Sequence, residues 1–267
     1  MQALNKAELG VSLFFASTYA NDKCGANGLP LTPNSIKILG RFQKLKTISH
    51  PRLCQYVDMV RGKHERLMVV QEYYNRSLES ERQAGIIRSC SEMLQIAYEI
   101  LQGLKYMNKH NIVHRTLSPS NIFLDPEGHV KLSSFGRYYM TDGGADVTFP
   151  IGYPRFMAPE VIGLGPVQIT DYHMLAPIPS NQNMSGPKVD VWSLGMILLE
   201  LYLDQTLWSS YTLPQTFAKI MFLAKHSKDE HPLDVLIREH NALNKLHKMP
   251  GNLQTLIRHC LIVSPHK

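Results

Sequence analysis

Residues 114–136 read HRTLSPSNIFLDPEGHVKLSSFG, and this stretch decides how the rest of the chain is interpreted. Two short apolar runs, 122–124 and 129–132, flank the turn-forming residues 126–128. This pattern predicts a β-hairpin. The hairpin joins two loops, at 114–121 and 133–136, which contain most of the candidate site residues.

The composition indicates a globular chain that belongs to none of the common specialised classes. With 267 residues, 44% apolar and 19% charged, it is long enough for one large domain or two small lobes. Its four cysteines lie far apart, which argues against a disulfide framework and a zinc site and favours a reducing compartment. The net charge is +6, but the basic residues are scattered, so we expect a solvated basic surface and no nucleic-acid partner. No apolar run approaches the roughly 20 residues that span a bilayer, and we expect a soluble or peripheral protein without a transmembrane segment.

The first 33 residues mix strand-like pieces with a turn-rich stretch. The apolar run 11–20 lacks the flanks of a signal peptide and is expected to be a core strand. Residues 21–30 are rich in turn formers and predict a loop. Gly25 and Gly28 are three residues apart in it, but an ordinary turn is favoured over a phosphate-binding loop because no strand pattern surrounds them.

Helical and strand periodicities then alternate along the chain. An amphipathic helix with Asn34 or Ser35 as its cap is expected to end before Pro51. Strands at 53–60 and 67–70 follow, and Ser91 is expected to cap a buried helix. Further helices are predicted at 191–203, near 214–225, at 233–248 and at 252–262.

Four motifs in this order and spacing resemble the protein kinase family. They are His-Arg-x-Leu-x-x-x-Asn at 114–121, x-Phe-Gly at 134–136, Ala-Pro-Glu at 158–160 and Asp-x-Trp-Ser-x-Gly at 190–195. The resemblance implies an α+β, bilobal kinase-like fold with a small β-rich N-lobe at 1–74 and a larger helical C-lobe at 75–267.

The segment 34–42, NSIKILGRF, together with Thr116 and Ser134, is more narrowly similar to the kinase-like domain of the TBC-domain-containing protein kinase-like family. Members of that family are regarded as pseudokinases. They also carry a Rab-GTPase-activating TBC domain and a rhodanese-like domain outside this domain.

The resemblance implies that the reactive positions are degenerate. Thr116 stands where kinases have the catalytic Asp, and Ser134 where they have the metal-binding Asp. Ser118 replaces the catalytic-loop Lys, and Arg41 replaces the helix Glu that pairs with the strand lysine. A threonine cannot accept a proton at neutral pH, and a neutral hydroxyl is a weak ligand for Mg²⁺. We therefore expect no catalytic residues and no metal site.

Other family positions are retained: His114, Arg115, Asn121, Phe135 and Gly136. By position, the stacked apolar column of kinases would consist of Leu45, Tyr56, His114 and Phe135. Arg115 could bind a phosphate on Thr141 or Thr148, although plain surface threonines are the simpler interpretation.

The nucleotide site is expected to be weak or absent. The family spacing places the strand lysine at Lys23 or Asp22, but Lys23 follows no apolar strand and is more simply a solvated loop lysine. Glu72 and Tyr74 lie in the hinge, and Phe123 falls where the family places the floor of the adenine pocket. These four residues, Lys23, Glu72, Tyr74 and Phe123, are the candidate cofactor contacts.

Two features depart from the family pattern. Residues 161–189 are longer than the usual connection and predict an inserted surface loop. The last residues match the run that leads to the arginine partner of the Ala-Pro-Glu glutamate and then stop. We therefore expect a kinase-like domain truncated near its end, with Glu160 unpaired unless Arg258, His266 or Lys267 neutralises it.

The favoured hypothesis is a kinase-fold pseudoenzyme that acts as an interaction or scaffolding module. The resemblance implies partners from the Rab pathway or endosomal assemblies and a cytoplasmic location, peripheral on endosomal membranes through those partners. The alternatives are an unconventional ATP-binding kinase with weak Ser/Thr phosphotransfer, using Lys23 with Asp125 or Asp142 as a surrogate acid, and a nucleotide-sensing switch without metal. The oligomeric state is left open.

Overall fold

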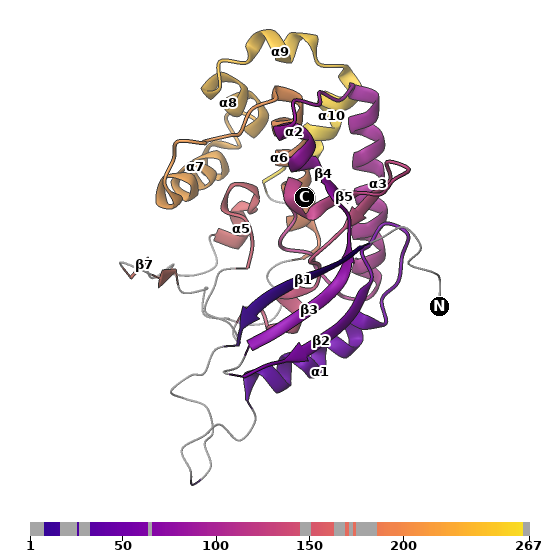
Figure 1. Ribbon diagram of the computed structural model, residues 1–267. Coiled ribbons are helices and arrows are strands. Elements are labelled where there is room, and N and C mark those ends of the chain that lie inside the picture. The colour runs from indigo at the N-terminus through magenta and orange to yellow at the C-terminus, as the bar shows by residue number, and fades with distance from the viewer. Residues whose placement is uncertain are drawn as a thin grey trace.

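The computed structural model describes residues 8–16, 26, 33–63, 66–144, 151–162, 169–170, 173–174 and 186–263. Figure 1 shows a sheet with one helix at the bottom and a helix-rich part above it. This arrangement confirms the predicted α+β kinase-like architecture.

The sheet contains strands β1 (Glu8–Phe15), β2 (Tyr56–Arg61) and β3 (Arg66–Tyr73), all antiparallel, in the order β1-β3-β2. Helix α1 (Asn34–Lys46) packs on one face of it, as Figure 1 shows. The apolar spacing of α1 produces this packing, because Ile38, Phe42 and Leu45 repeat at three- and four-residue intervals and are fully buried.

The prediction of a core strand at 11–20 was wrong in both its bounds and its environment. The strand is β1, and it lies at the edge of the sheet. Its residues Leu9, Val11, Leu13 and Phe15 are between 51% and 65% exposed. Because successive side chains of a strand point to opposite faces, these four share the face that α1 does not cover.

The predicted cap of α1 was also wrong. Pro33 precedes the helix, and Asn34 and Ser35 lie inside its first turn, where both are buried. The Asn34 side chain accepts a hydrogen bond from Lys37 Nζ at 2.9 Å.

The remaining elements belong to the helix-rich part and its short hairpins. They are β4 (Arg76–Ser77), α2 (Leu78–Gln83), α3 (Cys90–Lys109), η1 (Pro119–Asn121), β5 (Ile122–Leu124), β6 (Val130–Leu132), α4 (Arg137–Met140), η2 (Pro154–Phe156), α5 (Pro159–Ile162), β7 (Ile169–Thr170), β8 (His173–Met174), α6 (Lys188–Leu203), α7 (Leu213–His226), α8 (Pro232–Glu239), α9 (Leu243–Lys248) and α10 (Gly251–Cys260). The predicted hairpin in the central stretch is present as β5 and β6.

Helix α6 forms the centre of the helical part, with most of its side chains buried. Helix α10 packs closely on it at Gly195, where an added Cβ would lie 2.7 Å from Cys260 Cβ. Ser193 on the same helix donates a 2.6 Å hydrogen bond to the carbonyl of Phe156, which attaches η2 to α6. At position 195, only a glycine allows α6 and α10 to approach each other this closely.

Three further expectations differ in detail. The predicted helix 233–248 is two helices, α8 and α9, because the chain turns at Asn241 with φ of 52°. Helix α3 is capped by Ser89 rather than Ser91. Within the predicted insertion 161–189, α5 continues to Ile162, α6 begins at Lys188, and the described residues between them include the small β7–β8 hairpin.

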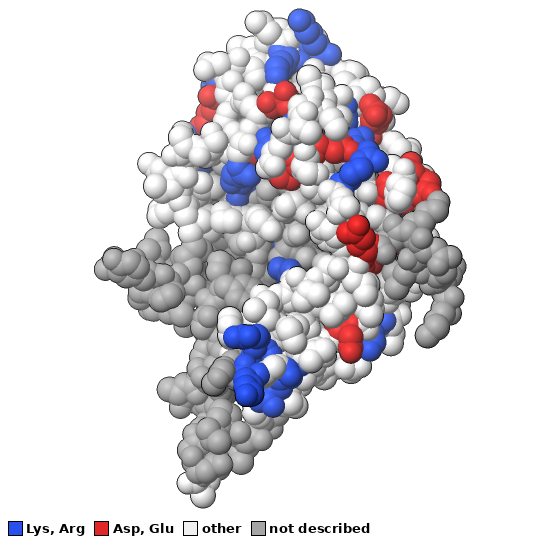
Figure 2. Space-filling model, in the orientation of Figure 1, with Lys and Arg blue, Asp and Glu red and all other residues white. Residues whose placement is uncertain are grey.

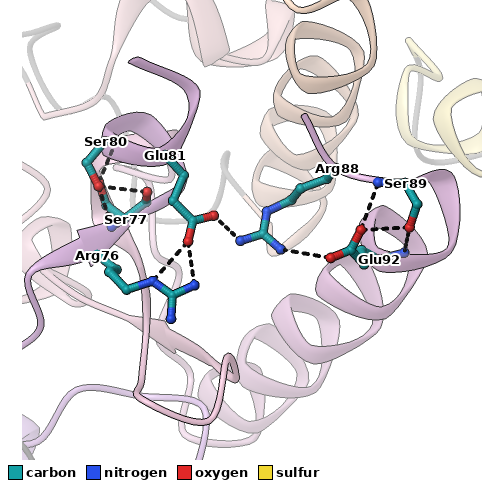
Figure 3. A network of polar contacts seen from close by, with 7 residues as sticks. All are labelled: Arg76, Ser77, Ser80, Glu81, Arg88, Ser89 and Glu92. Carbon is teal, nitrogen blue, oxygen red and sulfur yellow. Dashed lines mark hydrogen bonds and ion pairs between the residues drawn. The ribbon is translucent and has the colours of Figure 1, made fainter. Parts of the chain in front are cut away.

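Figure 3 shows a polar network that joins β4, α2 and the start of α3. The buried Glu81 accepts hydrogen bonds from Arg76 Nε at 3.0 Å and Nη2 at 2.6 Å, and it also binds Arg88. Ser89 and Glu92 form a capping box in which the Ser89 N–H donates to Glu92 at 2.8 Å. A buried carboxylate with two arginines is compensated, so this network fixes the segment that follows β3.

Candidate functional site

The candidate site is built from the two loops that flank the β5–β6 hairpin, and a carboxylate on α6 holds the first of them. The Asp190 oxygens accept the backbone N–H groups of His114 and Arg115, both at 2.8 Å. Burial raises the pKa of Asp190 to about 6. Arg115 and Ser134 both have positive φ, at 65° and 60°, a conformation that non-glycine residues seldom adopt outside constrained sites.

Thr116 and Ser134, the two positions where the carboxylates are missing, lie in direct contact. The buried Thr116 hydroxyl donates a 3.2 Å hydrogen bond to the Ser134 carbonyl and lies 3.2 Å from His114 Nδ1. Asn121 Nδ2 donates to the Thr116 carbonyl at 2.8 Å. The structure therefore brings together four of the residues that the sequence singled out, in one group of direct polar contacts.

A fixed positive charge lies at the position where kinases bind metal. Arg137 Nη2 donates a 3.0 Å hydrogen bond to Ser134 Oγ, and the Ser134 N–H points to Gln71 Oε1 at 3.4 Å. Burial, and secondly the charge of Arg137, lower the pKa of His114 to about 3, so this imidazole is neutral at physiological pH. A guanidinium on the hydroxyl opposes a cation there by charge repulsion.

The remaining polar groups of the first loop offer little to a metal or a phosphoryl group. Ser118 is buried, and its hydroxyl pairs with that of Ser120 at 2.9 Å. Within the part of the chain that the structure describes, no three His, Cys, Asp or Glu side chains are grouped closely enough to hold a metal ion. Hard cations such as Mg²⁺ need anionic oxygen ligands, which the residues of these two loops do not supply.

Arg41, at the helix position where kinases have Glu, binds the segment that follows the second loop. Its Nη2 lies 3.4 Å from Asp142 Oδ2, and its Nη1 donates to the Met140 carbonyl at 3.3 Å. Asp142 is therefore engaged by α1. Asp125, the other candidate surrogate acid, accepts the His129 N–H at 2.7 Å within the hairpin turn.

The candidate hinge residues Glu72 and Tyr74 bind each other. Glu72 is buried and accepts hydrogen bonds from the Gln55 N–H at 2.7 Å, from Lys131 Nζ at 3.0 Å and from the Tyr74 hydroxyl. Burial, and secondly the bond to Glu72, raise the pKa of Tyr74. Both side chains are thus already hydrogen-bonded to other residues of the chain.

The predicted pocket floor, Phe123, is in contact with a neighbouring tyrosine. The rings of Tyr73 and Phe123 meet edge to face with centroids 5.1 Å apart. On its other side Tyr73 lies against β1, where a Cβ on Gly10 would come within 2.9 Å of Tyr73 Cβ. Tyr73 therefore spans the space between β1 and Phe123.

The candidate strand lysine and the candidate phosphate acceptors are not part of this group of contacts. Lys23 and Thr148 lie outside the described residues, and β1, the strand beside β3, contains no lysine. Thr141 is buried and donates to the Arg137 carbonyl at 2.6 Å, which makes it a poor phosphate acceptor and corrects that suggestion.

The partners suggested for Glu160 were Arg258, His266 and Lys267. Arg258 instead pairs with Asp234 at 2.5 Å, and the other two lie outside the described residues.

The apolar column is assembled as expected from the sequence. Leu45, Tyr56, His114 and Phe135 are all buried. The rings of Tyr56 and Phe135 are 4.8 Å apart, and the Tyr56 hydroxyl donates to the Phe135 carbonyl at 2.6 Å. An added Cβ on Gly136, which has φ of 71°, would lie 2.5 Å from Leu45, so α1 packs directly on the second loop.

Sequence reasoning did not identify Gln71, Tyr73, Lys131, Arg137 and Asp190 as site residues. Asp190 and Arg137 could have been found, because one begins the Asp-x-Trp-Ser-x-Gly motif and the other directly follows x-Phe-Gly. Gln71, Tyr73 and Lys131 acquire their roles only through contacts between distant elements, and no local pattern marks them.

The model of the protein kinase domain matches residues 32–267. Human TBC domain-containing protein kinase-like protein is 53% identical over 268 residues, which cover 100% of this chain and 29% of the human protein. The Dictyostelium discoideum protein of the same name is 30% identical over 203 residues, 74% of this chain and 18% of that protein.

A protein of another name is also similar: CBL-interacting serine/threonine-protein kinase 21 from Arabidopsis thaliana is 28% identical over 180 residues, 67% of this chain and 39% of that protein. The chain thus spans less than a third of the length of the human relative. No helix in the described residues is at once long and apolar enough to cross a bilayer.

Proposed function

Because the chain belongs to the protein kinase family and is similar along its whole length to TBC domain-containing protein kinase-like proteins, we propose that it is a noncatalytic kinase fold that acts as an interaction module. The observation that carries the proposal is the hydrogen-bonded contact between Thr116 and Ser134, with Arg137 bound to the Ser134 hydroxyl.

The first step is the loss of phosphotransfer. A general base contributes roughly 10²- to 10⁴-fold to a rate, and Thr116 cannot supply it because its hydroxyl does not ionise at neutral pH. The metal position offers Ser134 and a guanidinium, and Arg41 binds Asp142 instead of a strand lysine. These losses act on different parts of the same reaction, so a surrogate for one of them would not restore the rate.

The second step concerns the nucleotide. Tyr73 contacts both β1 and Phe123, and the hinge side chains Glu72 and Tyr74 bind each other and Lys131. A flat base would have to displace Tyr73 from these contacts. We therefore propose that ATP binding is weak or absent and is insensitive to Mg²⁺.

An assay with radiolabelled ATP and Mg²⁺ tests phosphotransfer. The expected result is no transfer to the chain or to a generic Ser/Thr substrate above that of a Thr116→Ala variant. Transfer that requires Mg²⁺ and disappears in Asn121→Ala would reject the proposal and support the unconventional kinase.

Thermal unfolding tests the nucleotide. A ligand that binds the folded state stabilises it by RT ln(1 + [L]/Kd), so tight binding raises the melting temperature. We expect no shift with millimolar ATP, with or without Mg²⁺, for the wild type. Tyr73→Ala is the informative variant, because removing this ring would admit a base; a shift in this variant alone would identify Tyr73 as the block.

We further propose that this domain lies N-terminal to a Rab-GTPase-activating TBC domain, and that its partners are Rab-pathway or endosomal assembly components. The support is the name of the relatives, which includes a TBC domain, and the fact that they extend well beyond the matched region. Cross-linking mass spectrometry of the full-length protein with its copurified partners tests this. Cross-links from this domain to no other protein would count against the interaction role.

A further inference from the structure

The two edges of the three-stranded sheet differ in how they are protected against pairing with another strand. Edge strand β2 contains the charged residues Asp58 and Arg61, and its register shifts between Tyr56 and Asp58. Charges and register irregularities of this kind are how natural sheets prevent further strand addition. The β2 edge is therefore protected.

The β1 edge has none of these devices. Among the described residues the sheet ends at β1, which pairs with β3 over eight consecutive residues without a register shift. From Leu9 to Phe15 the strand contains no charged residue and no proline. A long, regular, apolar edge strand is a template for pairing with another strand.

The outward face of β1 is also apolar, although an antiparallel sheet with one solvated face normally places polar residues there. Leu9, Val11, Leu13 and Phe15 all project from this face and are more than half exposed. A strand that continued the sheet beside β1 would match this row if it also had apolar residues at alternate positions.

The charges near the two ends of β1 indicate which strand would match it. Glu8 begins the strand. At the other end, Arg66 lies over the Phe15 ring at 5.7 Å, and two more basic residues are exposed at the same end of the sheet: Arg61, which ends β2, and Lys63, in the β2–β3 connection. Figure 2 shows blue side chains gathered at this end of the sheet, next to the white surface over β1. The sheet is thus acidic at the start of β1, and its neighbouring residues are basic at the end of β1.

We propose that β1 pairs with β1 of a second copy of the chain, antiparallel and centred on Ser12. In this register Leu9 lies opposite the second copy's Phe15, and Val11 opposite its Leu13. Every outward pair is then apolar, and cross-strand pairs of this kind stabilise a sheet. The same register places Glu8 of each copy beside the Arg66 end of the other.

The pairing is isologous and closes at two copies, because both chains use the same edge, which is the unprotected one among the described strands of this sheet. One eight-residue strand buries less surface than a standard stable interface. The dimer is therefore weak and depends on concentration. Pairing of β1 does not depend on whether the chain is catalytic. Sedimentation measures the mass of the particle, so its result is independent of nucleotide chemistry.

The first experiment is sedimentation velocity of the 267-residue chain at concentrations up to about 1 mM. The expected result is a monomer–dimer equilibrium for the wild type and a monomer for Val11→Lys. Val60→Lys is the matched control: Val60 is 43% exposed and lies near the β2 edge, so this variant should dimerise like the wild type. Loss of the dimer in both variants would indicate packing between sheet faces and would reject edge pairing.

The second experiment tests the register. Val11→Lys and Leu13→Glu should each be monomeric, because each places a charge opposite an apolar side chain. Mixed together, they should form a heterodimer, since the introduced lysine and glutamate face each other while the remaining Leu13 and Val11 form an apolar pair. Both positions are exposed, so unchanged melting temperatures confirm that the variants fold.

A wild type that stays monomeric over the whole concentration range, a mixture that does not associate, or wild-type oligomers larger than a dimer would each overturn the proposal.

Discussion

The polar loops of the candidate site and the apolar column beside them share residues 114–136 but have changed to different extents. In the loops, Thr116, Ser118 and Ser134 stand where kinases have charged groups. The side chain of each is hydrogen-bonded to another residue of the chain. In the column, Tyr56 and Phe135 keep aromatic packing at 4.8 Å under a fully buried Leu45.

This difference indicates that packing and catalysis are separable requirements of the same loops. A buried aromatic side chain contributes several kcal/mol to stability, so losing it costs the fold. A buried carboxylate without its metal or its proton acceptor contributes nothing comparable, and replacing it with a hydrogen-bonded hydroxyl removes an unpaired charge from the interior. In a kinase fold that no longer needs catalysis, the role proposed here, selection for stability retains the column and leaves the charged positions free to change.

The largest expected effect comes from breaking the column. Phe135→Ala should lower the free energy of unfolding by roughly 3 to 5 kcal/mol, because it leaves a cavity between Tyr56 and α1. For a domain of this size each kcal/mol corresponds to about 2 to 4 °C, so calorimetry should show a fall of roughly 10 °C. Ser134→Ala, next to it in the loop, should cost only about 1 kcal/mol. Equal losses in the two variants would contradict the comparison.

The next largest loss of stability is expected at Gly136, where the second loop meets the apolar column. Gly136→Ala adds a Cβ 2.5 Å from Leu45 at a positive φ, so overpacking and backbone strain should together cost about 2 to 4 kcal/mol. Chemical denaturation measures this. The double variant with Leu45→Ala has room for the added methyl group, and the two losses should therefore not add. Full additivity would show that Leu45 is not the obstacle.

His114 belongs to both regions, and its effect depends on pH. Its pKa is lowered to about 3 in the folded chain against 6.5 in an unfolded one. The unfolded state therefore binds more protons in this window, and stability falls as the pH drops below 6.5. At about 1.4 kcal/mol per pH unit, the loss from pH 6.5 to 5 is about 2 kcal/mol.

The variant His114→Phe should lose this part of the pH dependence. Asp190 acts in the opposite direction, because its raised pKa lets the folded state keep a proton below pH 6, but Asp190 is present in both proteins and its effect cancels in the difference. Parallel plots of stability against pH for the two proteins would contradict a buried neutral His114.

The smallest effect is expected at Arg41. Its pair with Asp142 spans 3.4 Å, with the aspartate side chain 60% exposed, and exposed ion pairs contribute at most about 1 kcal/mol. A double-mutant cycle with Arg41→Ala and Asp142→Ala should give a coupling of about 0.5 kcal/mol or less. A much larger coupling would show that this pair, and not the column, holds α1 on the second loop.

The parts of the fold that the sequence predicted are those governed by local pattern. The periodicity of α1, α6 and α10 and the turn at 126–128 were sufficient, because each element is defined by its own residues. The exposure of β1 could not be predicted: a run of apolar residues indicates a strand but not whether the sheet continues beyond it. The break at Asn241 likewise depends on a single backbone conformation inside an apolar pattern.

For the candidate site, the motif spacing identified which positions are degenerate but not what has replaced their chemistry. The contacts from Thr116 to Ser134, from Arg41 to Asp142 and from Tyr73 to Phe123 join segments that are 18 to 101 residues apart. Long-range contacts of this kind depend on the relative placement of whole elements, which no spacing rule specifies.

The ion pair between Lys131 and Glu72 affects how far the sheet and the helical part can move relative to each other. It ties β6 to the end of β3, and Glu72 accepts two further hydrogen bonds, from the Tyr74 hydroxyl on the same oxygen and from the Gln55 N–H on the other. Enzymes that close over a substrate must open and close their cleft in every cycle. Here an ion pair between the buried Glu72 and the partly buried Lys131 joins the two parts, so it restricts changes in the angle between the sheet and the helical part. A partner that contacts both parts at once would then bind a preorganised surface and lose little conformational entropy in doing so.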